Sequence, residues 1–328
     1  MTSKTFIELP GGYKMPTIGL GTFGTKDENE VESAINAAIE AGYRYIDTAL
    51  LYENEVPIGK ALKKLFDSGK IKREELFITT KLPLFGIRAS SVEQYMKESL
   101  KNLGLEYVDL YLVHSPVCVK LTGRTLFDPD RKNKTFETEI TDHIAVWKKM
   151  EEQVDAGRAR SIGLSNFTAK QIEKILKSNP KYKPANLQIE IHVYLQQHDL
   201  VNYCHQNGIS VTAYAPLTSP GMNEFLVSLG FEPKQIPDLF ADETIKKIGK
   251  KYHKTNAQIA LKYLHQRNII VIPKSTESSM LKENMNILDF ELDSEDLAAL
   301  NSLEIGPKAR VIDWSFFPGL EKNLEFPF

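Results

Sequence analysis

The stretch that decides the fold covers residues 159–214 and reads ARSIGLSNFTAKQIEKILKSNPKYKPANLQIEIHVYLQQHDLVNYCHQNGISVTAY. Short apolar or β-branched runs alternate here with segments of helical spacing. The runs lie at 159–165, 186–190 and 210–214, and the helical segments at 168–176 and 200–207. Strands that are separated by helices pair in parallel, so this stretch predicts an α/β fold.

The same alternation continues on both sides of this stretch. Further strands are expected at 17–20, 45–47, 76–81, 108–114 and 269–273, and further helices at 27–41, 92–103, 145–156 and 256–266. Eight strand–helix units in 328 residues give about 41 residues a unit, which is typical of the (β/α)8 TIM barrel. Because no Pro-, Gly- or Ser-rich linker divides the chain, we expect a single barrel over residues 1–328.

Four segments fall outside the repeat. An N-terminal hairpin leads into the first strand over 6–20. Two inserts, 116–140 and 218–239, follow strands and are expected at the C-terminal face of the barrel, where active sites lie. The aromatic tail over 302–328 either folds over the barrel mouth as a substrate loop or packs on the wall. The sequence does not distinguish these two alternatives. The expected fold is drawn with the tail as a loop over the barrel mouth.

Composition excludes several classes of protein. The chain has 41 Lys and Arg against 43 Asp and Glu, a formal charge of −2, which argues against a nucleic-acid or anionic-membrane partner. Two cysteines are too few for a disulfide framework, and buried free thiols are the expected state. With no signal peptide pattern and no long apolar stretch, a cytoplasmic protein is expected.

The motif GLGTFG at 19–24 favours a different fold when it is considered alone. It matches the G-x-G-x-x-G pattern of a dinucleotide-binding Rossmann fold, and Asp47 follows at the distance of a ribose-binding acid. A Rossmann domain would need a second, differently patterned domain for substrate. The strand–helix repeat instead continues to about residue 273, which favours the barrel.

Seven consecutive expected strands end in polar side chains. These are Asp47, Lys81, His114, Ser165 with Asn166, Gln188, Tyr214 and Lys274. Each alone has an ordinary structural explanation, but a barrel brings all of these strand ends into one ring.

The ring has the chemistry of a proton donor. A tyrosine hydroxyl is a poor acid at neutral pH, and a nearby lysine ammonium lowers its pKa. Lys81 can do so for Tyr52, Asp47 can keep the lysine charged and oriented, and His114 can direct a carbonyl oxygen to the tyrosine hydroxyl. The histidines have neither H-x-H nor H-E-x-x-H spacing, so no metal is expected.

These residues resemble the aldo-keto reductase family over 6–328. The family's first signature resembles GYRYIDTALLYENE at 42–55, and its histidine strand resembles LGLEYVDLYLVH at 103–114. Its second and third signatures resemble AGRARSIGLSNF at 156–167 and IPKS at 272–275. The chain is most similar to aldose reductase-like members, and the middle and C-terminal thirds to those of insects.

The resemblance implies a monomeric enzyme that reduces aldehydes and ketones with NADPH. The implied catalytic residues are Asp47, Tyr52, Lys81 and His114. The implied cofactor-binding residues are Gly21, Thr22, Phe23, Asp47, Ser165, Asn166, Gln188, Tyr214, Leu217, Ser219, Lys274, Ser275, Glu283 and Asn284. The implied substrate-binding residues are Phe23, Tyr52, His114, Ser115 and Trp314.

The chain departs from the family pattern at two places. Met280 stands where many members have an arginine for the adenosine 2′-phosphate, so NADH use is an open alternative to NADPH. Phe23, Pro83 and Ser115 stand where aldose reductases have tryptophan, which implies a wider pocket. A bulky ketone such as a ketosteroid fits that expectation, and some insect members reduce 3-dehydroecdysteroids.

Two other functions on the same fold remain as alternatives. One is a redox-sensing binding subunit, since potassium-channel β subunits share the fold, and the other is a structural, crystallin-like protein. The presence of all four implied catalytic residues favours the enzyme.

Overall fold

The computed structural model describes residues 5–120 and 135–328. Its strands are β1 (Phe6–Glu8), β2 (Lys14–Pro16), β3 (Leu20–Gly21), β4 (Tyr45–Asp47), β5 (Phe77–Leu82), β6 (Val108–Val113), β7 (Cys118–Val119), β8 (Thr138–Glu139), β9 (Ala159–Ser165), β10 (Asn186–Glu190), β11 (Ser210–Tyr214) and β12 (Ile269–Val271). Its α-helices are α1 (Glu28–Glu40), α2 (Glu55–Asp67), α3 (Val92–Leu103), α4 (His143–Asp155), α5 (Ala169–Lys177), α6 (His198–Gln206), α7 (Met222–Ser228), α8 (Glu243–Tyr252), α9 (Asn256–Gln266), α10 (Ser278–Met285) and α11 (Ser294–Asn301). Short 3-10 turns are η1 (Leu50–Tyr52), η2 (Arg73–Glu75), η3 (Leu84–Gly86), η5 (Gly306–Ala309) and η6 (Leu320–Lys322).

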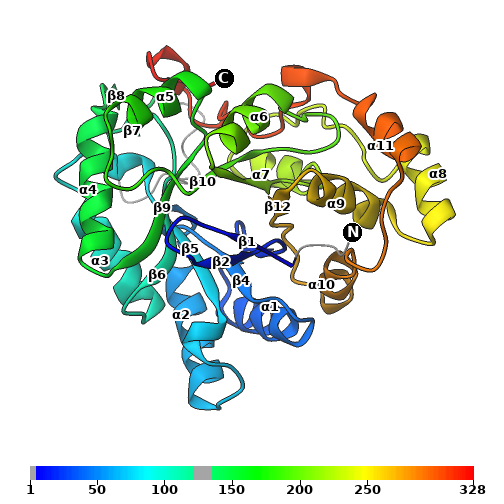
Figure 1. Ribbon diagram of the computed structural model, residues 1–328, viewed down its shortest axis with the longest axis horizontal. Helices are drawn as coiled ribbons and strands as arrows, with labels where there is room; N and C mark the ends of the chain where they lie inside the picture. The colour runs from blue at the N-terminus through cyan, green and yellow to red at the C-terminus, as the bar shows by residue number, and fades with distance from the viewer. Residues whose placement is uncertain (1–4, 121–134) are drawn as a thin grey trace.

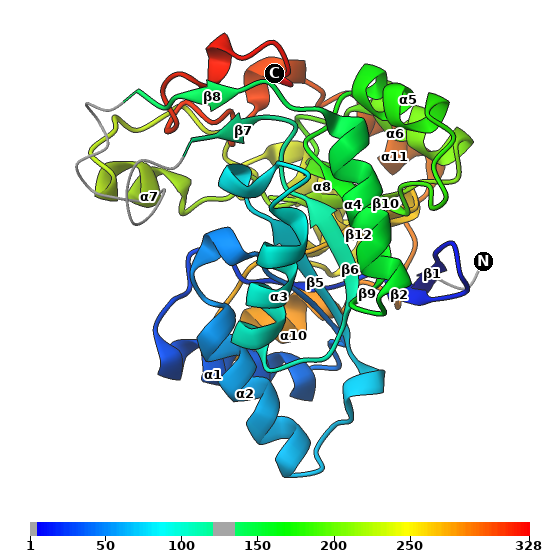
Figure 2. The same ribbon diagram turned by 90° about the vertical axis from the view of Figure 1, so that its left-hand side faces the viewer.

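Eight parallel strands form the central sheet, in the order β12-β11-β10-β9-β6-β5-β4-β3 (Figures 1 and 2). The two edges of this sheet meet, because Ile18 pairs with Val271 and Gly21 with Lys274 in parallel bridges. The closure is made by backbone hydrogen bonds such as the one from the Gly19 amide to the Val271 carbonyl, 2.9 Å. The predicted (β/α)8 barrel is therefore confirmed, and the Rossmann alternative is wrong.

Two glycines of the 19–24 motif, Gly19 and Gly21, lie where neighbouring groups leave no space for a side chain. A Cβ on Gly21 would lie 2.7 Å from the Ile272 carbonyl oxygen, across the seam between the first and last strands. A Cβ on Gly19 would lie 2.3 Å from the ring of Tyr45, inside the barrel. Such distances are too short for a side chain. Glycine at position 21 therefore lets the first and last strands approach each other, and glycine at position 19 leaves space for the Tyr45 ring of β4.

Most expected elements lie within two residues of their predicted bounds. The ranges 45–47, 92–103, 159–165, 186–190, 210–214 and 256–266 match the structure. The helix expected at 145 begins at His143 instead, because the Asp142 carboxylate accepts from the backbone amides of Ile144 and Ala145 and caps it. The first barrel strand is shorter than the predicted 17–20, with only Leu20–Gly21 in continuous pairing.

Helices α2, α7, α8, α10 and α11 are not among the predicted ranges. In α2, Pro57 lies in the first turn, where a missing amide hydrogen has no cost. Helix α7 lies inside the insert expected at 218–239. In the other insert, β7 and β8 pair in antiparallel fashion, and residues 121–134 lie outside the described part of the chain.

The N-terminal hairpin is confirmed. Strands β1 and β2 pair antiparallel with Ile7 opposite Met15, and Gly11 and Gly12 take the positive φ angles of the turn. Both cysteines are free and buried, and burial raises the pKa of the Cys118 thiol to about 11 and that of Cys204 to about 12.

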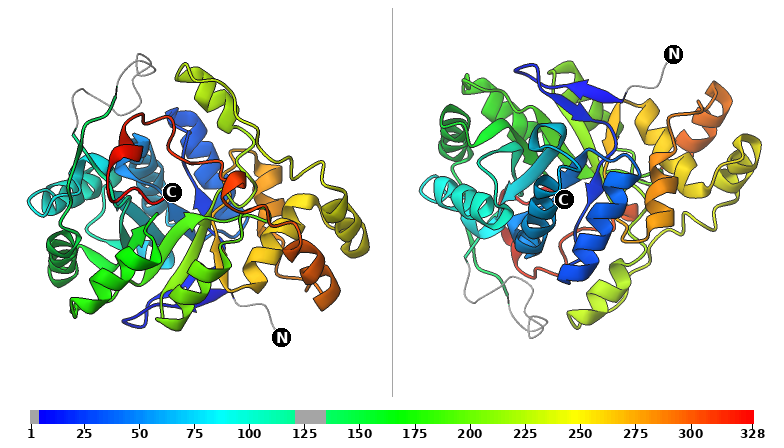
Figure 3. Two further views of the ribbon diagram at one scale, coloured as in Figure 1. Left: turned by 90° about the horizontal axis from the view of Figure 1, so that it is seen from above. Right: turned by 90° about the horizontal axis from the view of Figure 1, so that it is seen from below.

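The C-terminal tail lies over the mouth of the barrel, as Figure 3 (left) shows. Trp314, Phe316 and Phe317 are buried in one cluster with residues that follow β4 to β6, among them Leu51 and Leu84. The backbone amides of Val311 and Ile312 donate to the Glu190 carboxylate at the end of β10, at 2.7 and 2.8 Å. Of the two alternatives for the tail, the structure therefore supports the loop over the mouth.

Candidate active site

Four side chains predicted to act together meet at the C-terminal end of the barrel. Asp47 ends β4, Lys81 lies in β5, His114 follows β6, and Tyr52 lies in the η1 turn. The Lys81 ammonium donates to Asp47 Oδ1 at 2.6 Å and to the Tyr52 hydroxyl at 3.2 Å. The Tyr52 and His114 rings meet edge to face, with centroids 5.6 Å apart. Parallel strands of a barrel bring these positions together although they are far apart in the sequence.

Asn54 fixes the turn that carries Tyr52. Its amide nitrogen donates to the backbone carbonyls of Thr22 and Thr25, at 2.8 and 3.0 Å, and its oxygen accepts from the Thr48 hydroxyl at 2.8 Å. The Thr22 hydroxyl in turn donates to the Asp47 carbonyl at 2.9 Å. Because Asn54 is fully buried, this network ties the loop after β3 to the loop that presents Tyr52.

Burial dominates the electrostatics of the site. Lys81 is 0% exposed and Asp47 2%, so each charge depends on the other for stabilisation. Burial lowers the pKa of Lys81, while the charge of Asp47 acts in the opposite direction. Burial and then the charge of Asp47 raise the pKa of Tyr52 well above its usual value. The expectation that Tyr52 has a lowered pKa is therefore wrong for this site.

His114 is neutral at physiological pH. Burial, and then the positive charge of Lys81, hold its pKa well below the usual 6.5. Its Nδ1 atom is buried and has no hydrogen-bond partner within the described residues. A neutral imidazole carries one N–H group, which is a donor suited to a carbonyl oxygen.

The next strand ends form a second polar group beside these four residues. The Tyr214 hydroxyl donates to Asn166 Oδ1 at 2.7 Å, and Asn166 Nδ2 donates to the His114 carbonyl and to the Ser165 hydroxyl. Gln188 Nε2 donates to Asp47 Oδ2 at 2.7 Å. The structure thus brings together Ser165, Asn166, Gln188 and Tyr214, as the ring of strand ends predicted.

Of the residues predicted to meet the adenosine end of a dinucleotide, Lys274 lies at the seam of the barrel, and Glu283 and Asn284 lie in α10. Lys274 pairs with Gly21 across this seam and is exposed, and no carboxylate in the described part of the chain pairs with it. Ser275 and Asn284 are buried. The Glu283 carboxylate accepts a hydrogen bond from the Thr255 hydroxyl at 2.8 Å. Met280 is 56% exposed. The exposed Lys274 ammonium lies beside Gly21, which has no side chain to block access, and this arrangement is suited to binding a phosphate.

The loop after β11 carries the remaining predicted cofactor contacts, Leu217 and Ser219. Ala215, Thr218 and Ser219 all have positive φ, at 49°, 61° and 46°. This conformation is costly for side chains with a Cβ, above all for the β-branched Thr218. Strained backbone of this kind clusters at ligand-binding sites.

Aromatic rings cover the open side of Tyr52. The Phe23 ring lies edge to face with Tyr52 at 5.1 Å and with Phe225 of α7 at 5.2 Å, and Phe225 meets Phe316 of the tail at 5.7 Å. Phe225 and Phe316 were not predicted to belong to the site. They add aromatic bulk beside Phe23, at a place where the chain has no tryptophan.

Two predicted substrate residues are less accessible than expected. Ser115 is fully buried, and its hydroxyl accepts from the Val117 amide at 2.9 Å and donates to the Val117 carbonyl. Trp314 is 6% exposed and packs against Phe326 and Phe328. In this structure Ser115 therefore presents no free surface to a ligand, and Trp314 presents little.

Glu55, three residues after Tyr52, is a buried acid that the sequence did not single out. The Thr80 hydroxyl donates to its Oε1 at 2.5 Å, and burial raises its pKa to about 7 from 4.5. Its exposed fraction is 2%. A tertiary arrangement of strand β5 and helix α2 creates this environment, so no local pattern predicts it.

The Glu55 carboxyl should make stability depend on pH. Because the folded protein binds this proton more tightly than the unfolded chain does, protonated Glu55 contributes to the free energy of unfolding. This contribution is fully present below about pH 4.5 and is lost as the pH rises through about 7. Between pH 4.5 and 8 the parent protein should therefore lose roughly 3 kcal/mol more free energy of unfolding than Glu55→Gln. Urea unfolding of both proteins at several pH values measures this difference. Parallel curves would show that Glu55 does not titrate in this way.

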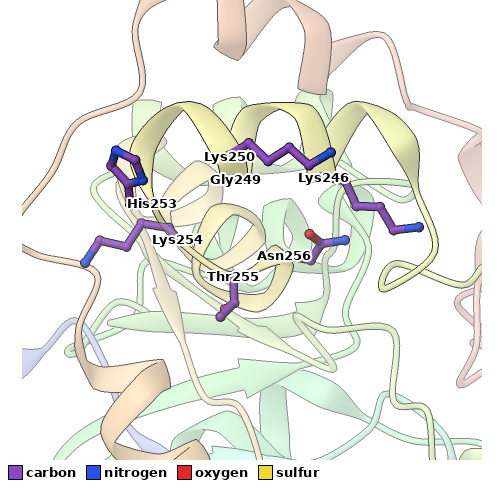
Figure 4. A pocket seen from close by; sticks show the side chains of 7 residues that line it. All are labelled: Lys246, Gly249, Lys250, His253, Lys254, Thr255 and Asn256. Carbon is purple, nitrogen blue, oxygen red and sulfur yellow. The ribbon is translucent and has the colours of Figure 1, made fainter.

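A separate hollow of about 520 Å³ lies on the outer surface between α8 and α9 (Figure 4). Its lining residues are Lys246, Gly249, Lys250, His253, Lys254, Thr255 and Asn256. Lys246 and Lys254 pair with Glu243 and Asp289, and Asn256 donates to backbone carbonyls. The hollow contains none of the residues at the strand ends.

Over residues 5–120 and 135–328 no group of three or more His, Cys, Asp or Glu side chains is arranged to hold a metal ion. In the same ranges no helix has the length and apolar character needed to cross a membrane.

The fold and the site together define a class: a TIM barrel whose C-terminal mouth holds a buried Asp–Lys–Tyr constellation beside a histidine. Residues 17–305 match the model of the aldo/keto reductase family. The chain belongs to this family and is an NADP-dependent oxidoreductase, as the signatures at 42–55 and 272–275 predicted.

Known relatives cover nearly the whole chain. It is 35% identical over 331 residues to Rho crystallin of Aquarana catesbeiana, covering 100% of this chain and 98% of that protein. It is 39% identical over 300 residues to dihydrodiol dehydrogenase 3 of Bos taurus, covering 90% of each. The solved structure of the aldose reductase from Schistosoma japonicum superimposes with a TM-score of 0.87 at 38% identity, covering 99% of both chains.

Proposed function

We propose that this protein reduces aldehydes and ketones to alcohols with NADPH, and that Tyr52 donates the proton. The observation that carries the proposal is the contact of the buried Lys81 ammonium with both Asp47, at 2.6 Å, and the Tyr52 hydroxyl, at 3.2 Å. A protonated hydroxyl held beside a buried cation at the mouth of a barrel is suited to general acid catalysis.

NADPH, when bound, supplies the hydride that reaches the carbonyl carbon. The chain's own residues supply the proton and the orientation. The N–H of neutral His114 holds the carbonyl oxygen toward Tyr52, which gives this oxygen its proton. The raised pKa of Tyr52 keeps it protonated at neutral pH, and the alkoxide that forms is the stronger base. Lys81 then stabilises the phenolate, and Asp47 keeps Lys81 oriented.

The nicotinamide end of the cofactor would lie on the second polar group. We propose that Tyr214 stacks on the nicotinamide ring while Ser165, Asn166 and Gln188 hold its carboxamide. Their mutual hydrogen bonds and their contact with Asp47 support this role, since they orient the side chains at one edge of the reacting centre. Gly21, Thr22, Phe23, Leu217 and Ser219 would contact the rest of the cofactor.

We propose that Lys274 and Ser275 bind the adenosine 2′-phosphate, with Glu283 and Asn284 near the adenine, and that NADPH is preferred over NADH. Lys274 is exposed and pairs with no carboxylate within residues 5–120 and 135–328, which supports the preference. Replacing Lys274 with Ala should weaken NADPH binding by about 10- to 100-fold, because a charge-assisted contact to phosphate is lost, and should leave NADH binding unchanged. Fluorescence titration measures both dissociation constants.

The matched control adds a positive charge near the proposed phosphate site instead of removing one. Met280→Arg places a guanidinium in the first turn of α10 and should tighten NADPH binding without affecting NADH. If the Lys274→Ala variant binds NADPH as tightly as the parent does, or if the parent itself binds NADPH and NADH with equal affinity, the role given to Lys274 is wrong.

We further propose a bulky carbonyl substrate, such as a ketosteroid of the 3-dehydroecdysteroid kind, bound among Phe23, Tyr52, His114 and the tail. The absence of tryptophan at Phe23 and Pro83 supports a large ligand, whereas the contact of Phe225 with Phe23 limits its width. A panel of carbonyl compounds from small aldehydes to ketosteroids, compared by kcat/KM, tests this class. A uniform preference for the smallest aldehydes would contradict it.

The non-enzymatic alternatives make different predictions. A structural, crystallin-like protein would turn over negligibly with any carbonyl. A redox-sensing subunit would bind NADPH and copurify with a membrane channel. The monomeric state and the cytoplasmic location stay predictions, and gel filtration tests the first.

A further inference from the structure

Tyr45 is a buried tyrosine inside the barrel, and it is not among the catalytic, cofactor-binding or substrate-binding residues that the family resemblance implies. It is the first residue of β4, two positions before Asp47, so both side chains point to the same side of the strand. The Tyr45 hydroxyl donates to Asp47 Oδ2 at 3.2 Å and accepts from the Thr79 hydroxyl at 3.4 Å. A polar group that is fully buried and directed at a charged side chain is a candidate for a role in the site.

The ring of Tyr45 has little freedom to move. Gly19 faces it where any Cβ would be 2.3 Å away, and Phe77 packs against it edge to face with centroids 5.3 Å apart. Tyr45 itself is 0% exposed. The position of Gly19 in the 19–24 motif is thus explained by the space that this ring needs.

The Asp47 carboxylate divides its contacts between its two oxygens. Oδ1 accepts from Lys81, and Oδ2 accepts from Gln188 at 2.7 Å and from Tyr45. In the proposed function Gln188 also holds the nicotinamide carboxamide. If the Gln188 amide turned toward that ligand, the Tyr45 hydroxyl would still donate to Oδ2.

We propose that Tyr45 is a positioning residue for the reaction: its hydroxyl takes up part of the Asp47 charge and so sets how strongly that charge acts on Lys81 and Tyr52. The inference rests on the proposed function and deepens it. Tyr45 touches neither substrate nor cofactor, and its effect passes through Asp47. Burial, followed by the charge of Asp47, raises the pKa of Tyr45 well above its usual value, so the hydroxyl stays a donor over the working pH range.

The test is Tyr45→Phe, which keeps the ring against Gly19 and Phe77 and removes only the hydroxyl. At saturating NADPH, kcat for carbonyl reduction should fall about tenfold, as expected for one lost hydrogen bond to a charged group, with KM unchanged. In the direction of alcohol oxidation, the pH at which the rate is half-maximal should rise. The reason is that the negative charge of Asp47, which raises the pKa of Tyr52, is then less compensated.

The matched control is Tyr43→Phe. Tyr43 is also fully buried, two residues earlier, and its hydroxyl donates to the Leu281 carbonyl at 3.2 Å, away from Asp47. This variant should keep the parent kcat and pH profile. If Tyr43→Phe and Tyr45→Phe lose activity equally with unmoved pH profiles, or if Tyr45→Phe behaves as the parent, the inference is wrong.

A readout without turnover separates this inference from the proposed function. In protein labelled with ¹³C at tyrosine Cζ, the Tyr52 signal is assigned by its loss in Tyr52→Phe, and its titration at high pH is compared between parent and Tyr45→Phe. A higher midpoint in Tyr45→Phe supports the inference, and an unchanged midpoint overturns it. If the parent reduces no carbonyl compound at all, the proposed function fails whatever the titration gives.

Discussion

Tyr52→Phe should lower kcat for carbonyl reduction by about 10²- to 10⁴-fold, the usual contribution of a general acid. The substitution removes the hydroxyl that contacts Lys81 at 3.2 Å and keeps the ring contacts with Phe23 and His114. The fold and the cofactor affinity should therefore be retained, and the loss should appear in kcat rather than in KM. Initial rates of NADPH oxidation with a reactive aldehyde measure it.

The control for this prediction is binding. NADPH affinity of Tyr52→Phe, measured by fluorescence quenching, should equal that of the parent. A variant that binds NADPH normally and turns over at the parent rate would remove Tyr52 from the mechanism. A variant that fails to bind NADPH would indicate a structural loss, and then Tyr52→His, which retains a side chain able to donate a proton, becomes the relevant comparison.

Lys81→Met should destabilise the protein by about 3–5 kcal/mol, because it leaves the Asp47 carboxylate buried without its cation. Lys81 donates to Asp47 at 2.6 Å and to the Thr48 carbonyl at 2.9 Å, and both groups lose this donor. The variant should also be inactive. Urea unfolding followed by circular dichroism measures the loss of stability.

A double variant distinguishes the charge from the packing. Asp47→Asn combined with Lys81→Met removes both charges, so it should recover much of the lost stability while remaining inactive. If Lys81→Met alone is as stable as the parent, the two charges are not as dependent on each other as their burial indicates. If the double variant is active, the ion pair is dispensable for the reaction.

One physical reason allowed the sequence to predict both the barrel and the polar residues that gather at its C-terminal end. In parallel strands the carboxyl ends all lie at the same end of the barrel, so Asp47, Lys81 and Gln188, which lie in the C-terminal parts of their strands, could be placed near one another without any tertiary information. Their partners confirm this, since Lys81 and Gln188 both donate to Asp47.

Contacts between segments far apart in the chain could not be predicted in this way. Phe225 and Phe316 meet over Phe23 only because α7 and the C-terminal tail fold onto the same mouth. The direction of the Tyr52 pKa was predicted wrongly, because the sequence shows a neighbouring lysine but not the degree of burial. Tyr45 has the sequence pattern of an ordinary core residue, and only its distance to Asp47 distinguishes it.

In the proposed reaction, hydride from NADPH reaches the carbonyl carbon while Tyr52 protonates the oxygen. The most direct measurement uses NADPH carrying deuterium at both positions of nicotinamide C4, with an aromatic aldehyde as substrate, and mass spectrometry and NMR of the product. We expect an alcohol with one deuterium on the carbinol carbon from the parent, and almost none from Tyr52→Phe in the same time. An unlabelled alcohol, or equal labelled product from both proteins, would contradict the account.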